Sequence, residues 1–174
     1  LDKIQPVITC PADVVLKTKA DDKKCTASYT VDASKVGVSD NCSTVFTYRY
    51  SIDGGKTLDY TAAVDTMLGV GTHQFAWMVS DESGNEDTCS HQITVNDETL
   101  PQFVCPSDTM IQTSPTDKEC VSKYEKTAFS LGATDNCSSS FTYSYKIDGG
   151  TEFSFADKVD TSLHVGVHQI TWIV

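Results

Sequence analysis

Four stretches of the chain alternate between apolar and polar positions: 25–31, 46–52, 73–79 and 89–95. A period of two places the apolar side chains of a strand on one face and the polar side chains on the other. Each stretch is therefore predicted to be a β-strand with one face on a core and the other in water. Trp77 falls on an inward position and is expected to anchor that core.

Polar segments that contain glycine separate these strands. Asp53-Gly54-Gly55-Lys56 suits a tight hairpin, because glycine adopts a positive φ without strain. The segment 81–85 indicates a second hairpin turn, with Asp81 placed to accept backbone N–H bonds. About seven short strands per repeat unit and no helical period predict an all-β fold, an immunoglobulin-like β-sandwich.

The chain repeats itself without a gap at an offset of 95 positions. Asp-Asn-Cys-Ser, Ile-Asp-Gly-Gly and His-Gln all recur, and Trp77 falls on Trp172. We therefore expect two tandem immunoglobulin-like sandwich domains, residues 1–96 and 97–174. The short linker contains Pro101, which should limit bending between them.

The second copy stops at Val174, which matches Val79, so it has no counterpart of the segment from Ser80 to Val95. We expect a domain truncated before its last strand. The natural chain should continue with an Asp-x-x-Gly-Asn turn and a cysteine near position 184. The chain also opens without an initiator Met or a signal peptide, which suggests a piece of a longer, processed polypeptide.

Charge narrows the range of partners. The 174 residues include 13 Lys plus Arg and 24 Asp plus Glu, for a formal net charge of −11. Nucleic acids and anionic membrane surfaces both attract basic proteins, so neither is expected as a partner. No apolar run approaches the roughly 18 residues of a transmembrane helix, so direct membrane insertion is not expected either.

Seven cysteines in strand-like sequence indicate disulfides and an oxidising, extracellular compartment. In an immunoglobulin-like sandwich the first and last strands begin at the same pole, so Cys10–Cys89 is predicted. Cys25–Cys42 and, in the second copy, Cys120–Cys137 follow by elimination, leaving Cys105 unpaired through the truncation. Cys25 starts its strand at the opposite pole, however, and Cys10–Cys42 with Cys25–Cys89 is the alternative pairing.

Two motifs resemble those of a known family. Asp-x-x-x-Pro-x-Ile-x-Cys-Pro at 2–11 is similar to the opening of a hyalin repeat (HYR) domain, and Trp77 to Cys89, with Asp81-x-x-Gly84-Asn85, is similar to its close. The added cysteines resemble a four-cysteine HYR-like variant of long Bacteroidetes surface proteins. The resemblance implies a cell-surface adhesin, a class that includes gliding-motility filaments.

Catalysis is not expected from the histidines, which are His73, His91, His164 and His168. No Ser-His-Asp or Cys-His arrangement recurs in both copies with the required acid partner. The segment 51–57 resembles the Asp-box hairpin of sialidase propellers, but the second copy breaks that motif and only a hairpin is inferred. The chain is therefore predicted not to be an enzyme.

Two kinds of glycosylation motif occur. Asn41-Cys42-Ser43 and its repeat at 136–138 are formal N-glycosylation sequons. We expect them to be unused, because the cysteine in each is predicted to be bridged and a bacterial host does not usually use such sequons. Asp-Thr-Met at 65–67 and at 108–110 resembles the short O-glycosylation motif of Bacteroidetes. That resemblance makes Thr66 and Thr109 candidate glycosylation sites.

Acidic residues and asparagines gather where the linker should meet a loop, and calcium takes six to eight oxygen ligands. A junctional calcium site is predicted from the first copy's Asp2, Asp40 and Asn41, with Asp81 as a further candidate, and from the second copy's Asp97, Glu98, Asp135 and Asn136. The competing interpretation is that these residues only cap turns. No other cofactor is expected.

The predicted function is structural and adhesive: a repeat module in a long extracellular filament or stalk. Its partners are expected to be neighbouring repeats of the same polypeptide and surface polysaccharide or other cell-surface proteins. A carbohydrate-binding module is one alternative, and Tyr60 and Phe155 are its only unplaced aromatic candidates. A pilus-type subunit that receives its last strand from a neighbour is another.

Overall fold

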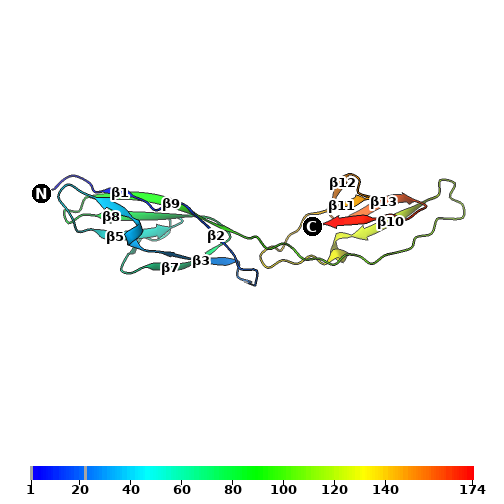
Figure 1. The fold of residues 1–174 in the computed structure, drawn as a ribbon, viewed down its shortest axis with the longest axis horizontal. Helices are drawn as coiled ribbons and strands as arrows, with labels where there is room; N and C mark the ends of the chain where they lie inside the picture. The colour runs from blue at the N-terminus through cyan, green and yellow to red at the C-terminus, as the bar shows by residue number, and fades with distance from the viewer. Residues whose placement is uncertain (1, 22) are drawn as a thin grey trace. The chain divides into compact units, whose positions relative to one another are not determined.

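The computed structural model describes residues 2–21 and 23–174. The chain forms two compact units, Leu1–Glu98 and Thr99–Val174, and the boundary lies two residues after the one predicted. Both units are built from β-strands, with only short 3₁₀ turns at Ala33–Lys35 and Ala128–Leu131 (Figure 1). Across the described residues, no helix has the length and apolar character needed to cross a membrane.

The first unit contains a five-stranded sheet and two pairs of strands. The large sheet has the order β2 (Val14–Lys17), β9 (Glu86–Asn96), β8 (Gly71–Ser80), β5 (Thr47–Ile52) and β6 (Leu58–Asp59). The pairs are β3 (Thr26–Val31) with β7 (Val64–Gly69), and β1 (Val7–Thr9) with β4 (Gly37–Ser39). The four alternating stretches correspond to β3, β5, β8 and β9.

The core of this unit lies between the large sheet and the β3–β7 pair. Phe75 and Trp77 on β8 and Ile93 on β9 are all 0% exposed, and they pack against residues of β3 and β7 such as Tyr29 and Leu68. Fully burying one such apolar side chain contributes about 1.5–3 kcal/mol. The prediction from the alternating pattern is therefore confirmed: one face of each strand lies on a shared core, and the unit is an all-β sandwich.

The two ends of the first unit lie in adjacent strands. β2 pairs with β9 in parallel, with Val14 opposite Ile93 and Lys17 opposite Asn96. The backbone N–H of Thr18 extends the ladder by donating to Asn96 O at 3.0 Å. The first and last parts of the unit are thus hydrogen-bonded side by side, running in the same direction.

The second unit has two smaller sheets. One has the order β12 (Glu152–Phe155), β11 (Tyr143–Ile147) and β14 (Ile170–Ile173), and the other pairs β10 (Val121–Thr127) with β13 (Lys158–His164). Leu131 and Val159 are fully buried here, and Trp172 lies against Tyr145 and Phe155. All residues of the segment 103–114 are described, and none of them lies in a strand.

Candidate functional site

A disulfide between Cys10 and Cys89 joins the end of β1 to β9, with a Cα–Cα distance of 5.7 Å. Polar contacts flank it on both sides. The N–H of Ile8 donates to Asp87 Oδ2 at 3.2 Å, and the N–H of Gln92 donates to Asp13 Oδ1 at 2.8 Å. The segment before the disulfide and the segment after it are therefore both fastened to β9.

The other two predicted pairings are wrong. Cys42 and Cys120 carry free, exposed thiols, as does Cys105, whereas Cys25 and Cys137 are each disulfide-bonded, so neither Cys25–Cys42 nor Cys120–Cys137 forms. The reason is the direction of the strands. Cys25 precedes β3 at the pole where β9 ends, and Cys42 follows β4 at the opposite pole.

Three aspartates from distant parts of the sequence meet at the N-terminal pole of the first unit. Asp2 precedes β1, Asp40 follows β4, and Asp81 follows β8. Each places one carboxylate oxygen within 4.8 Å of the others. We refer to Asp2, Asp40 and Asp81 as the polar cluster. Two of these residues were predicted as calcium ligands, and the third was the further candidate.

In each of these aspartates, Oδ1 caps the local backbone. Asp40 Oδ1 accepts from the N–H of Cys42 at 2.9 Å and of Ser43 at 2.7 Å, and Asp2 Oδ1 accepts from the N–H of Ile4 at 3.0 Å. The turn-capping interpretation is therefore correct for this set of oxygens.

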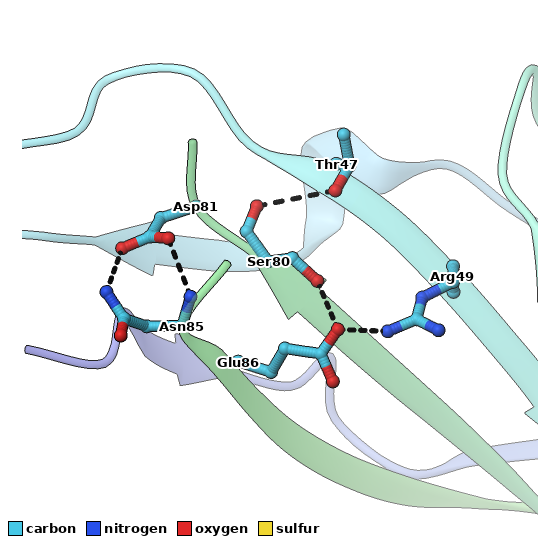
Figure 2. Close-up of polar contacts among 6 residues, drawn as sticks. All are labelled: Thr47, Arg49, Ser80, Asp81, Asn85 and Glu86. Carbon is cyan, nitrogen blue, oxygen red and sulfur yellow. Dashed lines mark hydrogen bonds and ion pairs between the residues drawn. The ribbon is translucent and has the colours of Figure 1, made fainter. Parts of the chain in front are cut away.

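Asp81 is held by Asn85, as Figure 2 shows. Its Oδ1 accepts from the N–H of Ser83 and of Asn85, both at 2.8 Å, and its Oδ2 accepts from Asn85 Nδ2 at 2.7 Å. Burial raises the pKa of Asp81, but the hydrogen bonds from Asn85, Ser83 and Gly84 outweigh it and lower the pKa below the ordinary value. This carboxylate is thus held ionised in a buried position.

The remaining oxygens of the cluster are different. Asp2 Oδ2 and Asp40 Oδ2 are each inaccessible to solvent, and within the described residues no N–H or O–H group donates to either. The Cys42 thiol lies beside them: burial first, and then the charges of Asp2 and Asp40, raise its pKa. A hydrogen bond with Asp2 also raises the pKa of this thiol. The pole therefore concentrates negative charge on oxygens that lack N–H and O–H donors.

The other predicted calcium ligands make the following contacts within their own units. Asn41 is exposed and donates to the sulfur of Cys42. In the first unit, Asp97 accepts from Thr18 Oγ1 at 3.1 Å, and Glu98 pairs with Lys17 at 2.7 Å. In the second unit, Asp135 Oδ1 caps the backbone of 137–138, and Asn136 Nδ2 donates to the sulfur of Cys137.

A small ionic network beside the Asp81 turn was not anticipated. Glu86, the first residue of β9, accepts from Ser80 Oγ at 2.7 Å and pairs with Arg49 on β5 (Figure 2). Thr47 Oγ1 donates to the carbonyl of Ser80. The network joins three adjacent strands at this pole. The repeat does not indicate it, because the counterpart of Arg49 is Ser144 and the counterpart of Glu86 is not among the 174 residues.

The histidines were expected to have no acid partner, but His73 and His168 each lie beside an aspartate. His73 Nδ1 lies 2.7 Å from Asp53 Oδ2, and His168 Nδ1 lies 2.7 Å from Asp148 Oδ2. Each ring's Nε2 faces a backbone carbonyl at 2.9 Å, that of Gly69 or of His164. The hydrogen bond to the carboxylate, then that to the carbonyl, raises the pKa of each histidine.

These histidine–aspartate clips fasten the β5–β6 turn to the start of β8, and the β11–β12 turn to the residues just before β14. Because a carboxylate and a carbonyl only accept hydrogen bonds, the ring satisfies both as the imidazolium, with neither nitrogen left to act as a base. The signal was present in the sequence, since Asp-Gly-Gly and His-Gln recur in both copies at the same spacing of 20 residues.

The aromatic candidates for carbohydrate contact lie among other aromatic rings. Tyr60 packs edge-on against Trp77 at 5.6 Å, and its hydroxyl accepts from the N–H of Ala33. Phe155 packs against Tyr145 and Trp172, both at 5.9 Å between ring centroids. Each ring is half-buried, so neither presents an open platform.

The two candidate glycosylation threonines differ in accessibility. Thr66 is half-buried within β7 and lies opposite Tyr29, whereas Thr109 is exposed in the irregular segment of the second unit. Attachment of a sugar to Thr109 would displace nothing in its unit, while Thr66 lies within a paired strand.

No protein-family model matches the chain, and a comparison with curated proteins finds no match. Solved structures give low-similarity matches. The fibronectin(III)-like modules of Clostridium thermocellum CbhA are 15% identical, with a TM-score of 0.35, over 53% of this chain and 98% of theirs.

Two other matches extend over nearly the whole chain. SGBP-B of the Bacteroides ovatus mixed-linkage glucan utilization locus, solved with a mixed-linkage heptasaccharide, is 14% identical with a TM-score of 0.40, over 98% of this chain and 44% of its own. A 1.5-MDa bacterial ice-binding adhesin is 11% identical with a TM-score of 0.35, over 93% and 55%. The chain thus spans about half the length of these two proteins.

Proposed function

We propose that this chain is a load-bearing repeat module of an extracellular protein and works in series with further repeats in a cell-surface filament or stalk. The observation that carries the proposal is the position of the Cys10–Cys89 disulfide. It joins the first strand of a unit to its last strand, with a sequence separation of 79 residues. A covalent bond at this position connects the two ends of the unit directly.

Tension applied at the ends of such a unit follows the shortest covalent path. That path runs from the N-terminal segment to Cys10, through the disulfide to Cys89, and along β9 to Asn96. Residues 11–88 form a closed loop outside this path. They contain β2 to β8 and most of the core, so a pulling force does not extend them while the disulfide is intact.

The parallel pairing of β2 and β9 adds a second, non-covalent resistance. When the ends are pulled apart, two parallel terminal strands slide along each other, so their hydrogen bonds are loaded together. The ladder from Val14–Ile93 to Lys17–Asn96, with its extension at Thr18, is loaded in this way if the disulfide is reduced. In this geometry the hydrogen bonds cannot break one after another from one end of the ladder.

The extracellular location is supported by the disulfide chemistry, because such bonds persist mainly in oxidising compartments. A net charge of −11 keeps a long array of such modules soluble and mutually repelling. The similarity of the motifs at 2–11 and 77–89 to hyalin repeats supports an adhesive surface protein. Its partners in this proposal are neighbouring repeats, and surface polysaccharide or other surface proteins at its contact sites.

Single-molecule extension of the full chain tests the proposal. With Cys10→Ser and Cys89→Ser together, part of the loop 11–88 becomes extensible, so the first unit should release a greater length than in the wild type. The separate disulfide at Cys25 limits the gain. Cys105→Ser, which removes a free thiol, is the matched control and should leave the extension unchanged. Equal release lengths in the wild type and the double variant would contradict a disulfide that bears the load.

A further inference from the structure

We propose that Asp2, Asp40 and Asp81 together bind one calcium ion at the N-terminal pole of the first unit. The inference stands apart from the load-bearing function, because it concerns a different group of residues and a different measurement. Three loops that are distant in sequence bring their carboxylates to one place, with ligand oxygens within 4.8 Å of one another. Acidic side chains alone would not define a site, so a second observation is needed.

That second observation is the state of the two unpartnered oxygens. Asp2 Oδ2 and Asp40 Oδ2 are inaccessible to solvent, and no N–H or O–H group among the described residues reaches either. A buried carboxylate oxygen without a donor loses its hydration and gains nothing in return. Two such oxygens beside a third carboxylate also repel one another. A cation bound between them removes both penalties.

The carboxylates are also held in position before any ion binds. In Asp2 and Asp40, Oδ1 is occupied by backbone N–H groups at 2.7–3.0 Å, which leaves Oδ2 as the oxygen available to a ligand. Asp81 is fixed by Asn85 at 2.8 and 2.7 Å. In Asp2 and Asp40, turn capping and metal binding therefore use different oxygens of the same side chain and do not compete. Both oxygens of Asp81 already accept hydrogen bonds, so Asp81 would bind the ion through a remaining lone pair.

The chemistry and the spacing favour calcium. The ligand atoms offered are carboxylate oxygens, and the backbone carbonyl of Asp2 lies against Asn85 at the same pole. Calcium binds oxygen at about 2.3–2.6 Å, so two of its ligands can lie up to about 5 Å apart. All the oxygen separations in the polar cluster fall within that limit. Magnesium demands near-ideal octahedral geometry, which carboxylates from three separate loops are less suited to supply.

Binding would tie three segments together: the chain before β1, the β4–β5 connection and the β8–β9 turn. The second copy has a counterpart of Asp40 in Asp135, but its sequence within the 174 residues has no counterpart of Asp81. We therefore expect one calcium ion per chain. The ion should stabilise the first unit and leave the second unaffected.

Calorimetric titration and thermal unfolding of the full chain, in calcium and in chelator, test this inference. The decisive variant is Asp40→Asn, because the amide keeps Oδ1 for the turn and replaces only the unpartnered Oδ2. We expect a loss of calcium affinity of at least tenfold. The matched control is Asp59→Asn, which removes the same charge from exposed β6 and should bind like the wild type.

The order of the unfolding temperatures of the wild type and Asp40→Asn should reverse between chelator and calcium. In chelator, Asp40→Asn should melt at or above the wild type, because it relieves like-charge repulsion, and in calcium it should melt below the wild type. A turn cap alone predicts the same ranking in both buffers. An unchanged melting temperature of the wild type on adding calcium would overturn the inference, as would an equal shift with magnesium or an equal loss of response in Asp59→Asn.

Discussion

The two units share a sequence pattern but not a complete set of strands. In the first unit Val7 pairs with Ser39, and the matching residues of the second unit, Gln102 and Thr134, also form a bridge. Beyond this point the units diverge. Residues 14–17 form β2, whereas the matching residues 109–112 form no strand.

The difference lies in the partner and not in the segment itself. β2 pairs with β9 alone, and the counterpart of β9 is not among the 174 residues. Without it, Met110 is 98% exposed, and Trp172 is half-buried where Trp77 is 0% exposed. A four-residue strand cannot satisfy its backbone by itself, so it forms only where a neighbouring strand offers a ladder.

Supplying that partner to the second unit should have the largest effect. We expect that appending the sequence of residues 80–96 after Val174 makes 109–112 a strand and gives Cys105 a disulfide partner. For a separation of 79 residues, as in Cys10–Cys89, the disulfide alone contributes about 4.5 kcal/mol in the chain-entropy description. Amide hydrogen exchange of 109–112 and denaturant unfolding of the second unit measure the two effects.

The control is the same extension with serine in place of its cysteine. It should still protect 109–112 from exchange, but with a smaller gain in unfolding free energy. Failure of both extended chains to protect these amides would show that the segment cannot pair as β2 does.

The sequence predicted the elements better than their partners. Alternation identified β3, β5, β8 and β9, because it is a local pattern within each strand. The repeat offset identified the two units, because it only requires comparing the sequence with itself. The sequence did not identify the parallel pairing of β2 with β9, because an alternating pattern does not show which strand lies next to another. The Cys25–Cys42 prediction was wrong because it followed from elimination, although the positions of the strands already placed the two cysteines at opposite poles.

The candidate site was predicted in part. The sequence grouped Asp2 and Asp40, with Asp81 as a further candidate, but it could not show that one carboxylate oxygen of Asp2 and one of Asp40 are buried without an N–H or O–H donor. Such burial depends on the packing of three distant loops. The histidine–aspartate clips could have been predicted from the sequence, because the aspartate and the histidine both recur at the repeat offset of 95 residues. The Arg49–Glu86 pair could not, because it occurs in one unit only.

A second comparison concerns the buried tyrosines. Tyr29 on β3 and its counterpart Tyr124 on β10 are 5% and 8% exposed. The hydroxyl of Tyr29 lies 2.7 Å from Nε2 of buried His91, and the matching histidine is again not among the 174 residues. Removing the hydroxyl of Tyr29 therefore takes away the partner of a buried histidine, whereas removing the hydroxyl of Tyr124 does not.

We expect Tyr29→Phe to cost the first unit about 1–3 kcal/mol, because the buried Nε2 of His91 then loses its partner, while Nδ1 has none among the described residues already. Tyr124→Phe should change the second unit much less. Denaturant unfolding of each variant in the full chain, followed by probes in each unit, measures both. Equal losses would mean that the hydroxyl–imidazole contact contributes nothing specific.

The smallest effect we expect distinguishes the units by pH. In both clips hydrogen bonding, first to the carboxylate, raises the pKa of the histidine above 6.5 and lowers that of the aspartate below 3.8. A raised histidine pKa gives stability that is fully present below about pH 6.5 and lost as the pH rises through the folded-state value. A lowered aspartate pKa gives stability that is present above about pH 3.8 and lost as the pH falls. Each clip therefore stabilises its unit most between these limits.

His91 opposes the clip in the first unit only. Burial lowers its pKa, so its contribution is lost as the pH falls below about 6.5. Between pH 7.5 and 5.5 we therefore expect the second unit to gain stability, while the first unit gains less or loses some. His73→Gln isolates the clip: its deficit relative to the wild type should be largest near pH 5.5 and shrink toward pH 7.5, as followed by denaturant unfolding. A deficit that does not change with pH would mean that His73 only fills space at the start of β8, because an uncharged contact has no proton to release.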